Sequence, residues 1–433
     1  MHIAVLTHNY PRFPGDFSGN FVASLSRELV RQGADVTVIA PWDPAFQPDF
    51  GAPVPGSPSL HLWRYAPRAD WHRLGYARTM EADVRMRGET YWLAPMFFAA
   101  GTADVLRWCR RRRPDIIHAH WLLPGGYFGA VASRLLKIPL AVSIPGSDAL
   151  VAAQNPLFRQ MASFALDQAG LITANSEALR AVAVDDLGAD PGRFDLIIYG
   201  VDAEAMQPDR SSRAAVRAEL GIDDRTLLLL AVGRMVHKKG FDGLVRALGI
   251  LRENGWLEKG EGNEGRQGNT GNASVIQRVV VAFVGDGDLR GEWEQLAKDL
   301  GVHGATRWLG TVPFDQIPRL YNACDAMVMP AVTRPATGLA VTVLDAMACA
   351  RPIIASDAAG NGLVVQDGIN GYLTPEGDDS ALAAAILRFA ALSADQRTAM
   401  GRASRRLVET EFSWPHLAHR YLDHFERLVK LRS

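Results

Sequence analysis

The sequence predicts an α/β protein with two Rossmann-like, doubly wound domains that face a central cleft. Short apolar runs alternate with amphipathic helical segments, and the alternation restarts at Leu227. The length of 433 residues also exceeds what one hydrophobic core usually holds. Strands that alternate with helices form a parallel sheet covered on both faces, and such sheets bind ligands at the carboxyl ends of their strands.

The first domain is expected to span residues 1–203. Its predicted strands are short apolar runs that end in turn residues: Ile3–Thr7, Asp35–Ala40, Ile116–His120, Leu140–Ile144, Leu171–Ala174 and Leu196–Tyr199. Its predicted helices lie between them: Asn20–Gln32, Pro95–Arg113, Gly126–Leu136 and Glu177–Asp186.

The second domain is expected to span residues 204–410, with the change of domain in the stretch Gly200–Pro208. Its predicted strands are Leu227–Val232, Val279–Val284, Arg307–Leu309, Ala326–Met329 and Ile353–Ser356. Its predicted helices are Phe241–Arg252, Leu289–Leu300, Gln316–Asn322, Val341–Cys349 and Ser380–Ala391. Residues 411–433 contain a last helix, Trp414–Leu431, which follows the FSWP break and is expected to cross back to the first domain.

Composition excludes several classes of protein. A net charge of -1 gives no electrostatic reason to expect a nucleic-acid partner. The three cysteines are odd in number and widely spaced, which fits buried thiols in a reduced cytosol better than disulfides or a metal site. The first ten residues lack the basic leader of a signal peptide, and the apolar run Tyr91–Ala103 is shorter than the roughly 20 residues that cross a bilayer. We therefore expect a cytoplasmic protein.

Arginines concentrate in the first domain. Six of them lie among aromatic residues in Arg64–Arg87, and Arg110–Arg113 adds four more. This pattern fits a solvated basic face, or alternatively a surface that docks on lipid or phosphate, with peripheral contact at the inner membrane face. The first domain is also where an anionic acceptor would bind. In the second domain, Asn254–Asn272 is rich in Gly, Asn and Glu, which predicts a mobile surface loop.

The stretch Ala231–Leu248 carries the strongest sign of phosphate chemistry. A strand ends at Gly233, Arg234 follows, and Lys239 stands at the start of a helix. Two cations beside a helix N-terminus suit a diphosphate, because Arg grips phosphate oxygens with two N–H groups while Lys supplies a compact charge. The alternative is a cationic turn in water. By contrast, the acidic turn Gly285–Asp288 is interpreted as the end of a strand and not as a phosphate cradle.

The first strand–helix loop offers a second phosphate contact. Gly19 precedes a predicted helix that Ser18 or Asn20 can cap, and a flexible glycine there brings backbone N–H groups close to a pyrophosphate.

The stretch from Gly338 to Ser356, GLAVTVLDAMACARPIIAS, resembles the donor-sugar loop and following helix of retaining glycosyltransferases of family GT4, which have the GT-B fold. The spacing of Arg234 and Lys239 resembles the diphosphate clamp of the same family. The resemblance implies that Gly338, Leu339 and Ala340 bind the donor phosphate through N–H groups. Two acidic positions of the family are changed in this chain, to Thr337 and to Asp345.

These two changes alter how the donor would be held. The resemblance implies that the position of Thr337 contacts hydroxyls of the transferred sugar, where a threonine still hydrogen-bonds but brings no charge. It implies that Asp345 contacts ribose hydroxyls with a side chain one methylene shorter than the family glutamate.

The segments Ile116–Ala130 and Ala141–Leu150 resemble the acceptor side of GT4 enzymes. His118 and His120 are expected to alternate on a strand, so that only the outer one, His120, faces the site; a buried, satisfied histidine is the alternative. Asp148 is expected to bind an acceptor hydroxyl, or else to cap the following helix. The family histidine before the Gly-Ser-Asp triplet is replaced by Pro145.

The resemblance implies transfer of a sugar, with retained configuration, from a UDP- or GDP-linked donor to a hydroxyl of a glycan, lipid or small molecule. Arg234 and Lys239 would neutralise the leaving diphosphate, so the reaction needs no metal and no other cofactor. His120 is the third candidate catalytic residue. Two alternatives stay open: a nucleotide-binding partner subunit with lost or weakened transfer, and a sugar-nucleotide epimerase of the same fold.

Overall fold

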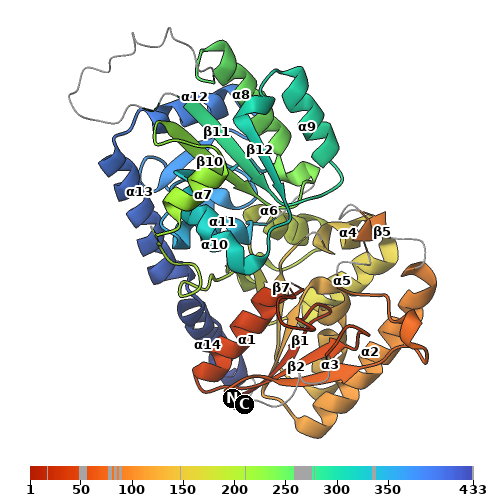
Figure 1. The fold of residues 1–433 in the computed structure, drawn as a ribbon. Coiled ribbons are helices and arrows are strands. Elements are labelled where there is room, and N and C mark those ends of the chain that lie inside the picture. The colour runs from red at the N-terminus through yellow and green to blue at the C-terminus, as the bar shows by residue number, and fades with distance from the viewer. Residues whose placement is uncertain are drawn as a thin grey trace. The chain divides into compact units, whose positions relative to one another are not determined.

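The structure is a computed structural model that describes residues 1–16, 18–47, 56–76, 80–81, 85–86, 90–146, 148–209, 211–257, 276, 278–333 and 338–431. Thr337 and most of the predicted loop 254–272 lie outside these residues. The chain divides into two compact units (Figure 1): unit 1 comprises Met1–Gly200 and Trp414–Ser433, and unit 2 comprises Val201–Ser413. The boundaries inferred from the sequence were residues 203 and 410.

Unit 1 is built on a seven-stranded sheet with the order β3-β2-β1-β6-β7-β8-β9. All its neighbouring strands pair in parallel. The strands are β1 (His2–Leu6), β2 (Asp35–Pro41), β3 (Ser59–Trp63), β6 (Ile116–His120), β7 (Leu140–Ile144), β8 (Leu171–Ala174) and β9 (Phe194–Leu196). A short antiparallel pair, β4 (Met80–Glu81) and β5 (Arg85–Met86), stands apart from this sheet.

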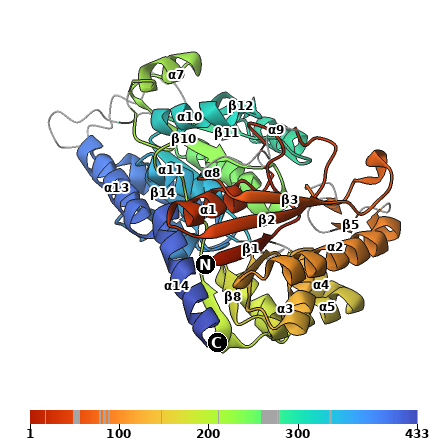
Figure 2. The same cartoon turned by 90° about the horizontal axis from the view of Figure 1, so that it is seen from below.

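Helices cover both faces of this sheet (Figure 2). The helices are α1 (Asn20–Arg31), α2 (Thr90–Arg112), α3 (Tyr127–Leu136), α4 (Asp148–Gln154), α5 (Pro156–Gln168), α6 (Glu177–Ala181) and α14 (Trp414–Lys430). Helix α14 packs against α1 and buries Leu417, Tyr421 and Phe425 in the core on that face. The opposite face is covered by α2, α3 and α5. The C-terminal helix α14 therefore completes the hydrophobic core of unit 1.

Unit 2 repeats the plan with a six-stranded sheet of order β12-β11-β10-β13-β14-β15 (Figure 1). Its strands are β10 (Thr226–Val232), β11 (Arg278–Val284), β12 (Thr306–Gly310), β13 (Ala326–Met329), β14 (Ile353–Ser356) and β15 (Gly371–Thr374). Its helices are α7 (Arg213–Glu219), α8 (Phe241–Glu253), α9 (Arg290–Asp299), α10 (Ile317–Ala323), α11 (Val341–Ala348), α12 (Asp379–Ala390) and α13 (Ala394–Leu407). Helix α8 packs between α9 and α12, while α10 contacts α7 and α11.

The differences from the predicted elements occur where the apolar pattern is short or mixed with polar residues. The strand expected at Leu196–Tyr199 is instead β9, Phe194–Leu196. The edge strands β3 and β15 and the helices α4, α5, α7 and α13 were not predicted. An edge strand such as Gly371–Thr374 carries too few apolar residues to stand out from a loop. Within the described residues no helix is long and apolar enough to cross a membrane.

Candidate active site

In unit 2 the order in which the strands are added to the sheet reverses between β10 and β13. These two parallel strands are neighbours although β11 and β12 lie between them in sequence. Doubly wound sheets bind ligands at such a switch point, beyond the carboxyl ends of the strands. The predicted donor-site segments follow these two strands: Gly233–Lys239 comes after β10, and Gly338–Ala340 comes after β13 and precedes α11.

Arg234 and Lys239 lie on one short loop. Arg234 is exposed, and Lys239 ends a single helical turn, His237–Lys239, whose last position before α8 is Gly240 with a φ of 62°. The aliphatic part of Lys239 runs across Gly233, where a Cβ atom would lie 3.2 Å from Lys239 Cε. The loop therefore directs the lysine back over the end of β10.

The turn after β11 supports this loop. The Gly233 N–H donates to the Val284 carbonyl over 2.9 Å, and the Met235 N–H donates to the Asp286 carbonyl over 2.9 Å. The approach is so close that a Cβ atom at Gly285 would lie 2.1 Å from the Gly233 oxygen. The interpretation of Gly285–Asp288 as a strand-ending turn agrees with this geometry, and its glycines are needed for backbone packing beneath Arg234.

The segment after β13 is fastened to the same loop. The Val332 N–H donates to the Lys238 carbonyl over 3.1 Å, and Gly240 fits so tightly that its Cβ would lie 1.9 Å from the Pro330 oxygen. The Thr342 hydroxyl, in the first turn of α11, donates to the Val232 carbonyl at the end of β10 over 3.2 Å. The loop is thus joined to the segment after β13 by backbone contacts, and helix α11 is joined to the end of β10 by the Thr342 hydroxyl.

Helix α11 begins with an open N-terminus. Ala340 is its N-cap residue and offers no side-chain acceptor, so the first N–H groups are not capped by a side chain. Leu339 is buried and Gly338 is half-buried. Asp345 lies on this helix at 8% exposure, and burial, with a smaller contribution from the charge of Asp202, raises the pKa of its carboxyl group to about 7. The predicted residue Thr337 lies outside the described residues.

Unit 1 has its own switch point between β1 and β6, and Gly19 lies in the loop that follows β1. Gly19 is the N-cap residue of α1 with a φ of 66°, and a Cβ there would lie 2.0 Å from the Asn9 oxygen. The prediction that Ser18 or Asn20 caps the helix is wrong, because α1 begins at Asn20 without any side-chain cap. Ser18 instead contacts Asp16 and Arg12.

The structure contradicts the expectation that His118 and His120 point to opposite faces of β6. His118 and His120 are two residues apart, so their side chains lie on the same face of the strand, with ring centroids 4.3 Å apart. His118 bonds the Ser143 hydroxyl over 2.8 Å and packs against Tyr421. His120 is 1% exposed, and neither ring nitrogen has a partner among the described residues. Burial lowers the pKa of both imidazoles, so both are neutral at pH 7.

Asp148 is the first residue of α4, yet its carboxylate contacts the segment that follows β6. Its Oδ2 accepts a hydrogen bond from the Leu122 N–H over 2.6 Å, whereas Oδ1 has no partner among the described residues. Burial raises the pKa of this carboxyl group to about 7. Pro145, which stands where the family has histidine, contributes its carbonyl to a 3.1 Å hydrogen bond from Asn175 Nδ2.

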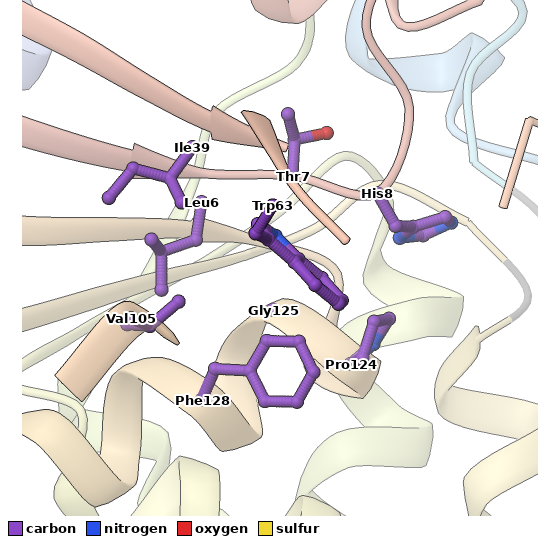
Figure 3. Close-up of a pocket in the computed structure, with 9 residues that line it drawn as sticks. All are labelled: Leu6, Thr7, His8, Ile39, Trp63, Val105, Pro124, Gly125 and Phe128. Atoms are coloured by element: carbon purple, nitrogen blue, oxygen red, sulfur yellow. The ribbon is translucent and has the colours of Figure 1, made fainter. Parts of the chain in front are cut away.

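A small apolar hollow lies beside this edge of the sheet (Figure 3). Its lining residues are Leu6, Thr7, His8, Ile39, Trp63, Val105, Pro124, Gly125 and Phe128. The internal volume of about 10 Å³ has room for roughly one water molecule, so it is too small for a sugar. His8 lies at one side of the group, and its ring packs 4.4 Å from that of Trp121.

Sequence reasoning missed His8, Asn175 and Tyr199, which follow β1, β8 and β9. Each lies within three residues of the end of an apolar strand, and that position is their signal in the sequence. The structure thus groups the predicted residues into two sets, each described within its own unit: Arg234, Lys239, Gly338–Ala340 and Asp345 in unit 2, and Gly19, His120 and Asp148 in unit 1.

Solved structures share this two-unit fold. The crystal structure of Anabaena Alr3699/HepE in complex with UDP has a TM-score of 0.71 at 20% identity, covering 99% of this chain and 100% of that one. Sucrose-phosphate synthase from Thermosynechococcus elongatus also has a TM-score of 0.71, at 19% identity, covering 99% of each chain. The fold is therefore that of the GT-B class, with two parallel-sheet α/β domains.

Two family models match consecutive parts of the chain. The glycosyl transferase 4-like domain matches residues 18–200, and the model of glycosyl transferases group 1 matches residues 212–407. The chain belongs to this glycosyltransferase family and is an enzyme of group 1. A similar protein is the D-inositol 3-phosphate glycosyltransferase 1 of Catenulispora acidiphila, 29% identical over 71% of each chain. The D-inositol 3-phosphate glycosyltransferase of Frankia alni is 27% identical over 82% of this chain and 80% of that one.

Proposed function

We propose that this enzyme transfers a sugar, with retained configuration, from a UDP-linked donor to a hydroxyl of an acceptor. The observation that carries this is the loop of Arg234 and Lys239, which a backbone hydrogen bond joins to the segment after β13. The hydroxyl of Thr342 in α11 also donates to the end of β10. The choice of UDP is supported by one structural neighbour, Anabaena Alr3699/HepE, which was solved with UDP and with UDP-glucose.

In this mechanism the donor diphosphate lies against Arg234, Lys239 and the open N-terminus of α11. As the bond between sugar and phosphate lengthens, negative charge grows on the leaving oxygen, and the two cations stabilise that charge without a protein nucleophile or a metal. The leaving phosphate takes the proton of the acceptor hydroxyl on the same face of the sugar, which retains the configuration. Asp345 holds ribose hydroxyls, and Thr337 contacts the transferred sugar.

The unit 1 residues serve the sugar and acceptor side of the reaction. His120 is neutral, so it can donate one hydrogen bond and accept another from sugar hydroxyls without repelling the cations of the donor site. Asp148 offers its unpartnered Oδ1 to an acceptor hydroxyl. Gly19 lets the start of α1 present backbone N–H groups to the donor phosphate.

The test begins with a thermal-shift screen of UDP, GDP, ADP and their glucose conjugates. A shift with UDP and UDP-glucose, followed by product formation in a panel of hydroxyl acceptors, supports the proposal. The configuration of the new bond is read from the anomeric proton coupling in the NMR spectrum of the product. A nucleotide that binds without any transfer or hydrolysis would favour the alternative, a nucleotide-binding partner subunit.

We also propose that the arginine-rich part of unit 1 rests on anionic lipid at the inner face of the membrane. Arg68 and Arg73 are exposed beside Trp71, whose ring packs against the ring of Trp92, itself 55% exposed. Arginines next to exposed indole rings suit an anionic lipid–water boundary. Co-sedimentation with phosphatidylglycerol vesicles at low salt, and its absence with phosphatidylcholine vesicles, is the expected result.

A further inference from the structure

Nine side chains in unit 1 have a buried polar atom without a hydrogen-bond partner among the described residues, and five of them lie at or just after the carboxyl ends of strands. These five are His8, His120, Asp148, Asn175 and Tyr199. The unpartnered atoms are Nδ1 of His8, both ring nitrogens of His120, Oδ1 of Asp148, Oδ1 of Asn175 and the hydroxyl of Tyr199. Buried polar atoms in proteins nearly always have partners, and each one without a partner costs about 1–3 kcal/mol.

These five side chains share one place in the fold. They come from the carboxyl ends of β1, β6, β7, β8 and β9, which are consecutive neighbours in the parallel sheet. Aromatic contacts connect three of them: the ring of Phe21 lies 4.1 Å from that of Tyr199 and 5.9 Å from that of His120. It also lies 5.4 Å from the ring of Trp121, which packs 4.4 Å from that of His8. Unpartnered groups gathered at the ligand-binding edge of a doubly wound sheet indicate a binding site and not scattered packing defects.

The chemistry of the set selects among ligands. Neutral imidazole and the tyrosine hydroxyl each donate and accept, while the unpartnered oxygens of Asn175 and Asp148 are acceptors when the acid is ionised. A phosphate oxygen would face two acceptors here and would be repelled. Sugar and cyclitol hydroxyls donate and accept together, and therefore satisfy all five groups.

The electrostatic surroundings agree with an uncharged ligand. No arginine or lysine among the described residues forms a hydrogen bond or ion pair with any of the five side chains. The pKa values of His8, His120 and Tyr199 are shifted mainly by burial, and no cation contributes to the shifts. Arg12, which lies in the loop after β1, is ion-paired with Asp16 over 2.7 Å and with Asp43 over 3.4 Å.

We propose that these five side chains form the acceptor site of unit 1 and that it takes an uncharged, hydroxyl-rich ring, a sugar or cyclitol without phosphate. His8, Asn175 and Tyr199 are thereby added to the acceptor-side residues. This inference rests on the proposed transfer reaction, and it concerns only the chemical class of the group that receives the sugar.

The experiment compares matched acceptors that differ only in a phosphate: myo-inositol with D-inositol 3-phosphate, and glucose with glucose 6-phosphate, each with UDP-glucose as donor. The expected result is a kcat/KM at least tenfold higher for the uncharged member of a pair. A preference for the phosphorylated member overturns the inference and leaves the transfer reaction standing. Binding of UDP-glucose without transfer to either uncharged acceptor also counts against the inference. If UDP-glucose does not bind at all, the proposed function fails first.

Tyr199→Phe separates a binding role from a structural one. Its hydroxyl has no partner in the described structure, so its removal is expected to leave the melting temperature unchanged or raise it. If the hydroxyl contacts the acceptor, kcat/KM for the uncharged acceptor falls about tenfold, which is the loss of one good hydrogen bond. Ser26→Ala, which removes another unpartnered buried hydroxyl, on α1, is the matched control and leaves acceptor kinetics unchanged. Unchanged kinetics in Tyr199→Phe would mean that the site holds only water.

Discussion

In unit 2 the side chain of Lys239 lies across Gly233, so that a Cβ atom at Gly233 would come within 3.2 Å of Lys239 Cε. Gly233 also has a φ of 157°, a backbone angle that residues other than glycine rarely adopt. The glycine therefore leaves room for the aliphatic part of Lys239 to cross the end of β10.

Gly233→Ala should displace Lys239 and weaken binding of UDP-glucose about tenfold, which corresponds to the loss of one charge-assisted hydrogen bond. Isothermal titration calorimetry measures the change. Gly291→Ala is the control, because that glycine on α9 has open space around it and an alanine there favours the helix. Equal affinity in the two variants would mean that the position of Lys239 does not matter for the donor.

Arg234→Ala should weaken the binding of UDP and UDP-glucose by tenfold or more, because an arginine that grips a diphosphate contributes charge-assisted hydrogen bonds. The effect should shrink at high salt, since part of it is electrostatic. Arg406→Ala removes an exposed arginine from α13 and serves as the charge-matched control. An unchanged titration curve for Arg234→Ala would show that this residue is not part of the clamp.

Asp345 should make donor binding depend on pH. Its carboxyl pKa is 3.8 in the unfolded chain and about 7 in the folded protein, so the ionised form that accepts hydrogen bonds from ribose hydroxyls is reached only as pH rises through 7. Affinity for UDP-glucose, whose diphosphate does not titrate in this range, should increase from pH 6 to pH 8. Asp345→Asn should abolish that increase, and a flat profile in the wild-type protein would contradict the assignment.

The same shift affects stability. Between pH 4 and pH 7 the folded state keeps a proton on Asp345 that the unfolded state has lost, so this group lowers the free energy of unfolding as pH rises. The loss is complete above pH 7 and absent below pH 4. Denaturant titrations at pH 5 and pH 8 should therefore show a smaller difference for Asp345→Asn than for the wild-type protein.

Thr337→Glu should change the donor preference or raise turnover, because a carboxylate forms stronger hydrogen bonds to sugar hydroxyls than a threonine does. Initial rates with UDP-glucose, UDP-galactose and UDP-N-acetylglucosamine measure the change. Thr337→Val, which removes the hydroxyl and keeps the shape, is the companion variant. Identical donor profiles in all three proteins would exclude contact between this position and the sugar.

The strands nearest the switch points were predicted well because they are buried on both faces and are therefore continuously apolar. Ile116–His120 and Ala326–Met329 were assigned at their observed bounds. The edge strand Ser59–Trp63 and the helix Pro156–Gln168 were missed, since their patterns are mixed and depend on neighbours that the sequence does not reveal.

The sequence by itself determined the tandem α/β plan, the family, and the loop of Arg234 and Lys239, because periodicity and local spacing are properties of consecutive residues. Only the tertiary structure decided that His118 and His120 lie side by side and that burial keeps both neutral. It also brought His8, Asn175 and Tyr199 to one edge of the sheet, from strands far apart in the chain. Burial and unsatisfied hydrogen bonding arise from packing, and packing joins residues that no local pattern connects.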